Sequence, residues 1–481
     1  MSNPTIVLVR NDLRLADNPA LLAAARRGAP TIPVYIYSPQ EDGDWSFGGA
    51  TKWWLHQSLT AFSNSLKEKG AELLILKDES TLDCLEKLLK KTGAEAVYWN
   101  RRYEPHSIEI DKNLKTRLKE VDVEVRSFPG NLIFEPWTIS TGSGTPYKVY
   151  TPYWKACLEA ETPAPPLSPP ESLKPFEGTL EGLQIEDLKL EPKIDWASGM
   201  ESFWEPGESG AEKRLRQFID SALFTYKEDR NLPYQDGVSY LSPYLHFGEI
   251  SPRQIWQQVK EALDKTDSNS KKENARVYLK EIVWREFAHH ILYHFPATLE
   301  EPLRENFEKF PWESNQKDLY KAWCKGKTGY PIVDAGMRQL WTTGWMHNRV
   351  RMIVASFLTK DLLISWQDGA KWFWDTLVDA DLASNTFGWQ WTAGCGADAA
   401  PFFRIFNPVL QGKKFDPDGT YVREWVPELK HAPAKWIHEP WEASTEELEK
   451  AGITIGVDYP EPVVNHGEAR KKALDIYASI K

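Results

Sequence analysis

The first part of the chain alternates short apolar runs with segments of helical periodicity. Asn18-Pro19 is typical of the start of a helix, and a second helix is predicted to run from about Thr81 to Gly93. The apolar runs have the length of buried strands. They are Thr5–Val9, Thr31–Tyr37, Ala71–Leu76 and Ala96–Trp99. Buried strands that alternate with helices predict an α/β domain, built from a parallel sheet with helices on both faces.

The pattern changes after this region. Prolines crowd the segment from Pro163 to Pro175, which therefore cannot continue a helix or a central strand. Helical periodicity then prevails at Ala211–Phe224, Pro252–Leu263, Glu273–His294, Ile332–Thr342, His347–Thr359 and Trp366–Leu377. We therefore expect an α/β N-terminal domain over residues 1–130, an interdomain linker over 131–205 and a mostly α-helical C-terminal domain over 206–481.

Charge and composition narrow the classes of function. The 481 residues include 58 basic and 69 acidic side chains, for a net charge of −11 at pH 7. A protein coated with nucleic-acid-binding charge is excluded, so any contact with DNA must use a local basic patch. No apolar run approaches the roughly 18 residues of a membrane span, and no secretory signal precedes the first strand. The four cysteines lie far apart, so we expect a reduced, cytoplasmic protein without a disulfide framework or structural zinc.

Aromatic residues are unusually frequent, with 22 Trp, 18 Tyr and 20 Phe. Many of these rings must form the core, but their number also favours stacking surfaces or a ring-shaped cofactor. The ordinary dinucleotide fingerprint is absent, because Arg10-Asn11-Asp12-Leu13-Arg14 follows the first strand in place of a glycine-rich turn. A dinucleotide would therefore bind elsewhere in the chain.

Two basic or mixed segments in the helical part are candidates for binding. Glu281, Trp284 and Arg285 share one helix face, although an amphipathic helix with an internal ion pair explains them equally well. The segment 335–360 contains basic residues and no acidic ones. Its charged residues are Arg338, Arg349, Arg351 and Lys360. They predict the local basic patch that an acidic protein would need in order to contact DNA.

A third candidate is acidic. Asp379 and Asp381 could form a metal pair or an acid–base pair, accept hydrogen bonds from a polar ligand, or pair with Arg351. Asn385 lies one helical turn after Asp381 and offers an amide instead of a charge. Since the histidines His289-His290 and His347 have no second ligand pair at metal spacing, we expect no metal site.

Several long motifs resemble those of the photolyase/cryptochrome flavoproteins, in the same order along nearly the whole chain. They are Arg10–Pro19, Leu241–Glu249, Thr328–Ala335, Trp345–Met352, Asp379–Trp391 and Asp398–Pro408. The resemblance implies that the helical domain holds FAD, which accounts for the missing glycine-rich turn. It also implies a DNA partner that contains cyclobutane pyrimidine dimers.

The resemblance assigns residues to FAD. The implied set is Tyr226, Ser239, Leu241, Ser242, Arg285, Arg351, Asp379, Asp381 and Asn385. Within this set, the segment around Ser242 would hold the phosphates, which agrees with Ser242-Pro243 as the start of a helix, where phosphates commonly bind. Arg351 would pair with Asp379 beside the flavin ring, Asp381 would contact its polar edge and Asn385 would face N5.

The resemblance also assigns residues to catalysis, DNA binding and electron transfer. Glu281 and Asn348 would hydrogen-bond the flipped dimer, Trp284 and Trp391 would pack against it, and Met352 and Asn385 would complete the catalytic set. The implied contacts to DNA phosphates are Arg230, Arg349 and Arg404. The implied electron-transfer chain is Trp389, Trp366 and Trp312.

We therefore expect light-driven repair of cyclobutane pyrimidine dimers by a monomeric, cytoplasmic protein that joins the nucleoid during repair. The alternative is a cryptochrome-type blue-light sensor without repair activity. Asn385, where plant cryptochromes carry aspartate, and the short segment after Pro408 both favour repair. A helical flavoprotein oxidase is a third alternative, for which no acid–base pair is evident.

A second, antenna chromophore is also expected in the N-terminal domain. Asn100-Arg101-Arg102-Tyr103-Glu104 ends a predicted strand, where ligands of parallel sheets collect. His106-Ser107 replaces the Asn-Glu pair of one folate-binding branch. A methenyltetrahydrofolate bound differently and an 8-hydroxydeazaflavin are both left open.

Overall fold

The computed structural model describes residues 3–161 and 163–480. The chain forms two compact units that are each discontinuous in sequence. Unit 1 comprises Met1–Ser221, Ser239–His294 and Val378–Ala383, and unit 2 comprises Ala222–Val238, Phe295–Leu377 and Ser384–Lys481. The domain boundaries at residues 130 and 205 stay a prediction.

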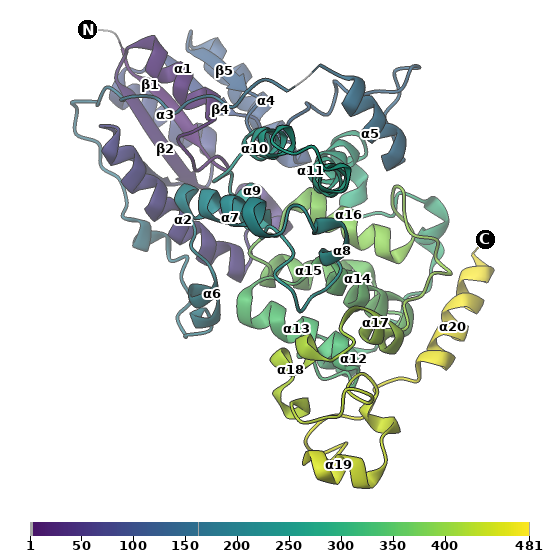
Figure 1. Cartoon of the computed structure of the whole chain (residues 1–481). Coiled ribbons are helices and arrows are strands. Elements are labelled where there is room, and N and C mark those ends of the chain that lie inside the picture. The colour runs from purple at the N-terminus through teal and green to yellow at the C-terminus, as the bar shows by residue number, and fades with distance from the viewer. Residues whose placement is uncertain (1–2, 162, 481) are drawn as a thin grey trace. The chain divides into compact units, whose positions relative to one another are not determined.

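Unit 1 contains a five-stranded parallel sheet in the order β3-β2-β1-β4-β5 (Figure 1). The strands are β1 (Thr5–Val9), β2 (Thr31–Tyr37), β3 (Leu74–Lys77), β4 (Ala96–Asn100) and β5 (Glu124–Phe128). The predicted α/β class with a parallel sheet is confirmed. The apolar pattern missed β5 because this edge strand is partly exposed and includes Glu124 and Arg126. It also placed the start of β3 too early, at Ala71.

Helices pack against the strands of this sheet (Figure 1). They include α1 (Pro19–Arg27), α3 (Thr81–Thr92) and α4 (Pro105–Glu120), with η1 (Pro39–Trp45) and α2 (Gly49–Glu68) between β2 and β3. The predicted start is confirmed for α1, whose Asn18 side chain accepts from the Leu21 N–H at 3.1 Å. The core between sheet and helices is apolar, with Ile6, Val97 and Trp99 fully buried.

The rest of unit 1 consists of helices and long irregular segments. Its elements are α5 (Tyr150–Glu159), η2 (Ile185–Leu188), α6 (Ser198–Phe203), α7 (Glu208–Ser221), α9 (Ser242–His246), α10 (Pro252–Asp264) and α11 (Asn269–His294). The last and longest of these, α11, carries buried polar residues such as Glu286 and His289 along its C-terminal half. Buried polar groups need partners, so this half of α11 is where a polar site is expected.

The regular structure of unit 2 consists of helices joined by loops. Its elements are α8 (Tyr226–Asp229), η3 (Pro296–Leu299), η4 (Glu305–Lys309), α12 (Lys317–Cys324), α13 (Pro331–Thr343), α14 (Asn348–Ser356), η5 (Phe357–Asp361), α15 (Trp366–Thr376), most of α16 (Leu382–Ala393), α17 (Pro408–Phe415), α18 (Thr420–Trp425), η6 (Pro427–Leu429), η7 (Pro440–Glu442), α19 (Thr445–Ala451) and α20 (His466–Ser479). The helix predicted over His347–Thr359 is shorter, because α14 passes into the π-helical turn η5 at Phe357.

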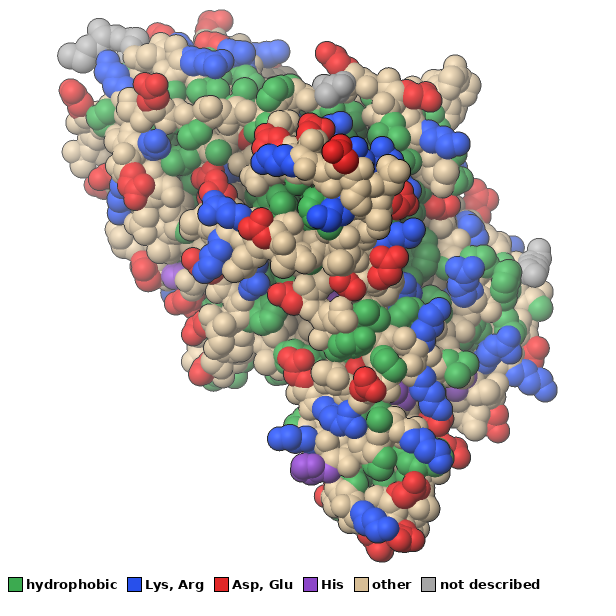
Figure 2. All heavy atoms as spheres, viewed as in Figure 1, with side chains coloured by type: hydrophobic (Ala, Val, Ile, Leu, Met, Phe, Trp, Pro, Cys, Tyr) green, Lys and Arg blue, Asp and Glu red, His purple; other side chains and the backbone are tan. Residues whose placement is uncertain are grey.

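The surface carries both signs of charge. Figure 2 shows Lys and Arg side chains interspersed with Asp and Glu over the visible face, as expected for a modest net negative charge. Among the described helices, none has the length and apolarity that a membrane span requires.

Candidate functional site

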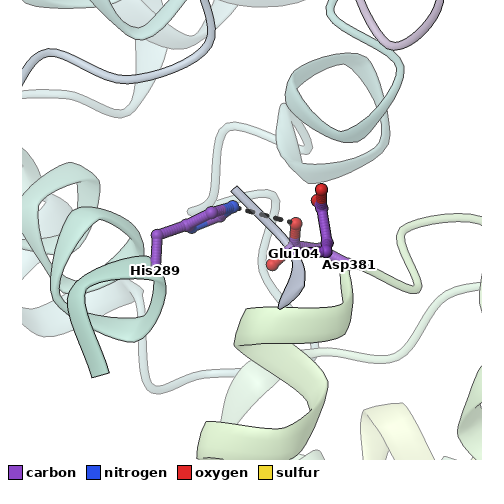
Figure 3. Close-up of side chains that lie close together, drawn as sticks. All are labelled: Glu104, His289 and Asp381. Carbon is purple, nitrogen blue, oxygen red and sulfur yellow. Dashed lines mark ion pairs between the residues drawn. The ribbon is translucent and has the colours of Figure 1, made fainter. Parts of the chain in front are cut away.

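Three ionisable side chains from distant parts of unit 1 meet in one buried cluster (Figure 3). Glu104 follows β4, His289 lies on α11, and Asp381 immediately precedes α16. Their ligand atoms lie within 4.8 Å of one another, and His289 Nε2 is 3.4 Å from Asp381 Oδ2. The other ring nitrogen, Nδ1, is 3.0 Å from the carbonyl oxygen of Arg285.

The pKa values of Asp381 and His289 are shifted in opposite directions. Burial alone would raise the pKa of Asp381, but His289 and Arg285 together hold that pKa well below its usual range. Burial would lower the pKa of His289, yet the Asp381 carboxylate raises it above the ordinary histidine value. Both shifts favour the charged forms, so His289 and Asp381 form a buried ion pair beside Glu104.

Such a cluster has a definite chemical use. An ionised carboxylate is an acceptor without donors, so Asp381 suits a ring N–H of a bound ligand. His246, on α9, is also buried, and this burial lowers its pKa despite the acidic groups nearby. The site therefore combines the buried Asp381 carboxylate with the polar side chains of His289 and His246, as the polar edge of a flavin would require.

One face of α11 carries the predicted trio Glu281, Trp284 and Arg285, all partly exposed. Arg285 Nη1 donates to the carbonyl oxygen of Asn131 at 2.8 Å. The indole of Trp284 stacks on the ring of Tyr150, with 3.5 Å between ring centroids and 9° between ring planes. Trp284 and Arg285 are thus anchored to residues that precede α11 by more than a hundred positions.

The segment predicted to hold FAD phosphates lies at the start of α9. Leu241 is buried, and the exposed Ser242 is the first residue of the helix, followed by Pro243. The first turn of a helix presents N–H groups without helical partners, and these are suitable for a phosphate. Ser239 belongs to the same loop and is partly exposed.

Unit 2 gathers three arginines around one histidine. Arg349 and Arg351 lie on α14, and Arg230 follows α8. Burial together with these three positive charges lowers the pKa of His347 to about 3. Arg349 donates to Asn231 Oδ1 and also lies over the ring of Phe415, 4.5 Å from its centroid. A basic patch is therefore present.

The composition of this patch differs from the one that the sequence suggested. Lys360 is only 1% exposed and donates to the carbonyl oxygen of Arg404 at 3.1 Å, because it belongs to the buried π-helical turn. Arg338 forms an ion pair with Glu428 at 2.7 Å. Including Lys360 and Arg338 in the patch was wrong, and Arg230 takes part instead.

The remaining predicted residues of unit 2 lie on helices or in the loop before α17. Asn348 is exposed at the first position of α14, and Met352 lies one turn later, with its sulfur 3.9 Å from Arg349 Nη1. Asn385 is buried and donates from Nδ2 to the carbonyl oxygen of Ala370 at 3.0 Å. Arg404 is exposed.

The tryptophans that the sequence linked to electron transfer all lie in unit 2. Trp389 on α16 and Trp366 on α15 are each 2% exposed, whereas Trp312 is partly exposed. A Cβ atom at Gly369 would overlap the six-membered ring of Trp389, so glycine at this position lets the indole lie against α15. Two interior rings and one surface ring fit a path from solvent to the interior, and the path itself stays a prediction.

The predicted set is divided between the units. Unit 1 holds Ser239, Leu241, Ser242, Glu281, Trp284, Arg285, Asp379 and Asp381, and unit 2 holds Tyr226, Arg230, Trp312, Asn348, Arg349, Arg351, Met352, Trp366, Asn385, Trp389, Trp391 and Arg404. The pairing of Arg351 with Asp379 therefore stays a prediction.

Sequence reasoning missed the role of His289 in the buried cluster. His289 was classed with ordinary helix histidines, although it lies one turn after Arg285 and so shares a face with an implied site residue. That spacing was a usable signal. The meeting of His289 with Glu104 had no sequence signal, since it depends on tertiary packing.

Comparisons with known proteins identify the family of this chain. Residues 5–171 match the family model described as DNA photolyase, and residues 278–479 match the FAD binding domain of DNA photolyase. A deoxyribodipyrimidine photo-lyase of Agrobacterium fabrum is 50% identical over 479 residues, covering 99% of this chain and 98% of the relative. Cryptochrome-2 of Arabidopsis thaliana is 42% identical over 479 residues, covering 98% of this chain and 78% of the relative.

A solved structure is also similar along its whole length. The crystal structure of a class III photolyase from Agrobacterium tumefaciens superposes with a TM-score of 0.95 at 50% identity, covering 100% of this chain and 98% of that one. The fold and the match to an FAD-binding domain define a flavoprotein of α/β and helical parts. The chain belongs to the photolyase/cryptochrome family, and its C-terminal part is an FAD-binding domain.

Proposed function

We propose that this protein repairs cyclobutane pyrimidine dimers in DNA in a light-driven reaction that uses FAD. The observation that carries the proposal is the full-length, 50% identical match to a deoxyribodipyrimidine photo-lyase. When bound and reduced, FAD supplies the electron that light drives to the dimer.

The residues of this chain fit that cofactor. Asp381 is buried and anionic, so it can accept a hydrogen bond from the N3–H of a flavin and orient the ring. His289 holds the carboxylate in place from α11. The first turn of α9 would bind the phosphates, and Asn385 would present a neutral amide to the flavin.

Three further groups would bind the DNA. Arg230, Arg349 and Arg404 would contact phosphates, since guanidinium groups bind phosphate oxygens in a bidentate manner. Flipping a dimer out of the duplex costs a few kcal/mol. Stacking on Trp284 and Trp391 would offset it by roughly 1–3 kcal/mol per base.

Hydrogen bonding would then stabilise the dimer as charge develops on it. Glu281 and Asn348 would donate to the dimer carbonyl oxygens, which requires that Glu281 be protonated. Met352, one turn beyond Asn348, would pack beside the lesion.

The alternative is a blue-light sensor without repair activity, because a plant cryptochrome is 42% identical to this chain. The test is to reduce the flavin, add single-stranded DNA that contains thymine dimers, illuminate, and follow the recovery of thymine absorbance. Recovery in the light and none in the dark supports repair. Flavin photochemistry without recovery would support the sensor.

The proposal includes a second, light-harvesting chromophore of the folate or deazaflavin type in unit 1. Trp137 is 48% exposed and lies 5.5 Å from the ring of Tyr293, 6.4 Å from the ring of Tyr103 and 5.9 Å from the guanidinium of Arg101. Aromatic rings beside a cation suit a flat, anionic pigment. If this is the site, Trp137→Ala should remove the second chromophore from the absorption spectrum and leave the flavin bands.

The proposal also covers the setting of the reaction. We expect a monomer that acts in the cytoplasm and joins the nucleoid at damaged DNA. Sedimentation of the protein with and without dimer-containing DNA would test the monomeric state.

A further inference from the structure

Tyr150 covers one face of the Trp284 indole. The two rings are parallel within 9°, and their centroids are 3.5 Å apart. At this distance the rings are in full van der Waals contact, so no base can stack on the covered face. Tyr150 begins α5 and Trp284 lies on α11, and both belong to unit 1.

Tyr150 is itself held firmly. Its hydroxyl donates to the carbonyl oxygen of Lys280 at 2.6 Å, and its ring meets the ring of Phe287 edge to face at 5.8 Å. The side chain is 6% exposed, while Val149 beside it is 47% exposed. Because Lys280 belongs to α11, the tyrosine is tied to the same helix that carries Trp284, at a point where α5 reaches the surface.

We propose that Tyr150 is a positioning residue that fixes the plane of Trp284 for the flipped pyrimidine dimer. This inference rests on the proposed function, in which Trp284 packs against the flipped dimer. Tyr150 covers one face of the indole, and Phe287 lies beside both rings, 5.9 Å from Trp284 and 5.8 Å from Tyr150, so the dimer meets a ring already in its bound orientation. Preorganisation of this kind removes the entropic cost of ordering the side chain on binding.

The contact assigns the segment that carries Tyr150 a role in DNA binding. Sequence analysis treats residues 131–205 as a linker, yet α5 within it supplies the ring behind the lesion platform. Discrimination of damaged from intact DNA would therefore depend partly on a residue outside the helical part.

The test compares four holoproteins: the parent, Tyr150→Phe, Tyr150→Leu and Trp284→Ala. Affinity for a short single-stranded oligonucleotide with one thymine dimer is measured by fluorescence anisotropy, beside its undamaged twin. Tyr150→Leu should weaken binding of the dimer DNA about three- to tenfold, the cost of ordering one large side chain, and leave intact DNA within about twofold. Tyr150→Phe keeps the ring and should bind like the parent. Flavin absorbance and repair at saturating DNA should change in neither variant.

A double variant separates the possible failures. If Tyr150 acts through Trp284, then Tyr150→Leu should have no further effect in the Trp284→Ala background. The positioning role would be overturned if Tyr150→Leu bound dimer DNA as tightly as the parent does. It would also be overturned if Tyr150→Leu weakened this binding as much in the Trp284→Ala protein as in the parent. Unchanged discrimination in Trp284→Ala would instead refute the lesion-stacking role of Trp284, and this inference with it. If Tyr150→Leu loses flavin, Tyr150→Met takes its place under the same criteria.

Discussion

Exchanging the Asn385 amide for a carboxyl group should create a buried group that prefers to stay protonated. Asn385 is 9% exposed, and its Nδ2 donates to the carbonyl oxygen of Ala370 at 3.0 Å. In Asn385→Asp, an ionised carboxylate would place a second acceptor against that carbonyl. A protonated carboxyl would restore the donor.

The size of the effect follows from this one hydrogen bond. Leaving a buried acceptor unsatisfied costs about 1–3 kcal/mol. Since one pKa unit corresponds to about 1.4 kcal/mol, the bond alone should raise the carboxyl pKa from about 3.9 to about 5–6. Burial acts in the same direction, because it disfavours the charged form.

A raised pKa makes stability depend on pH. The folded variant holds its proton more tightly than the unfolded chain, so its unfolding free energy should fall relative to the parent as pH rises from about 4 to 6. The deficit should reach about 1–3 kcal/mol at neutral pH, and urea denaturation at several pH values measures it. Asn385→Ala is the matched control, with a loss that does not depend on pH.

The same variant should alter the photochemistry. With Asn385 facing flavin N5, a carboxyl there supplies a proton in place of a neutral amide, so repair should weaken and protonated flavin should accumulate in the light. A pH-independent difference from the parent, or repair at the parental rate, would refute this account of Asn385.

Three further predictions concern other residues. Trp366→Phe should block photoreduction of oxidised flavin while chemically reduced protein still repairs; fast photoreduction in transient absorption would reveal another route. Arg349→Ala should weaken binding of damaged and intact DNA equally and lower the salt slope by about one, whereas Trp391→Ala should cost about 1–3 kcal/mol on damaged DNA alone. Equal losses for Trp391→Ala on both DNAs, at unchanged flavin content, would contradict lesion stacking. His289→Gln should destabilise more at pH 6 than at pH 9, because a raised pKa gives stability that is lost as pH rises through it; equal losses in urea denaturation would contradict the ion pair with Asp381.

The sequence predicts well those features that depend on local pattern. Central strands such as β1 are continuous apolar runs, and Asn18 with Gly28 marks the ends of α1, so both elements could be located. β5 could not, because an edge strand has no need of a fully apolar sequence.

In the candidate site, too, features set by local pattern could be predicted and features set by tertiary packing could not. A shared helix face correctly groups Trp284 with Arg285, since it follows from helical geometry. The burial of Lys360 depends on a π-helical turn, and the stacking of Tyr150 on Trp284 depends on how α5 packs against α11. Neither leaves a mark in residue spacing.

The packing of α15 against Trp389 can be tested by mutating Gly369. Any side chain at this position would collide with the indole, so no residue other than glycine fits without moving the ring. A saturation library at codon 369, scored for survival after ultraviolet light and then visible light, should retain glycine alone. Alanine would be the most informative loss, since it adds one methyl group and leaves the rest of the chain unchanged.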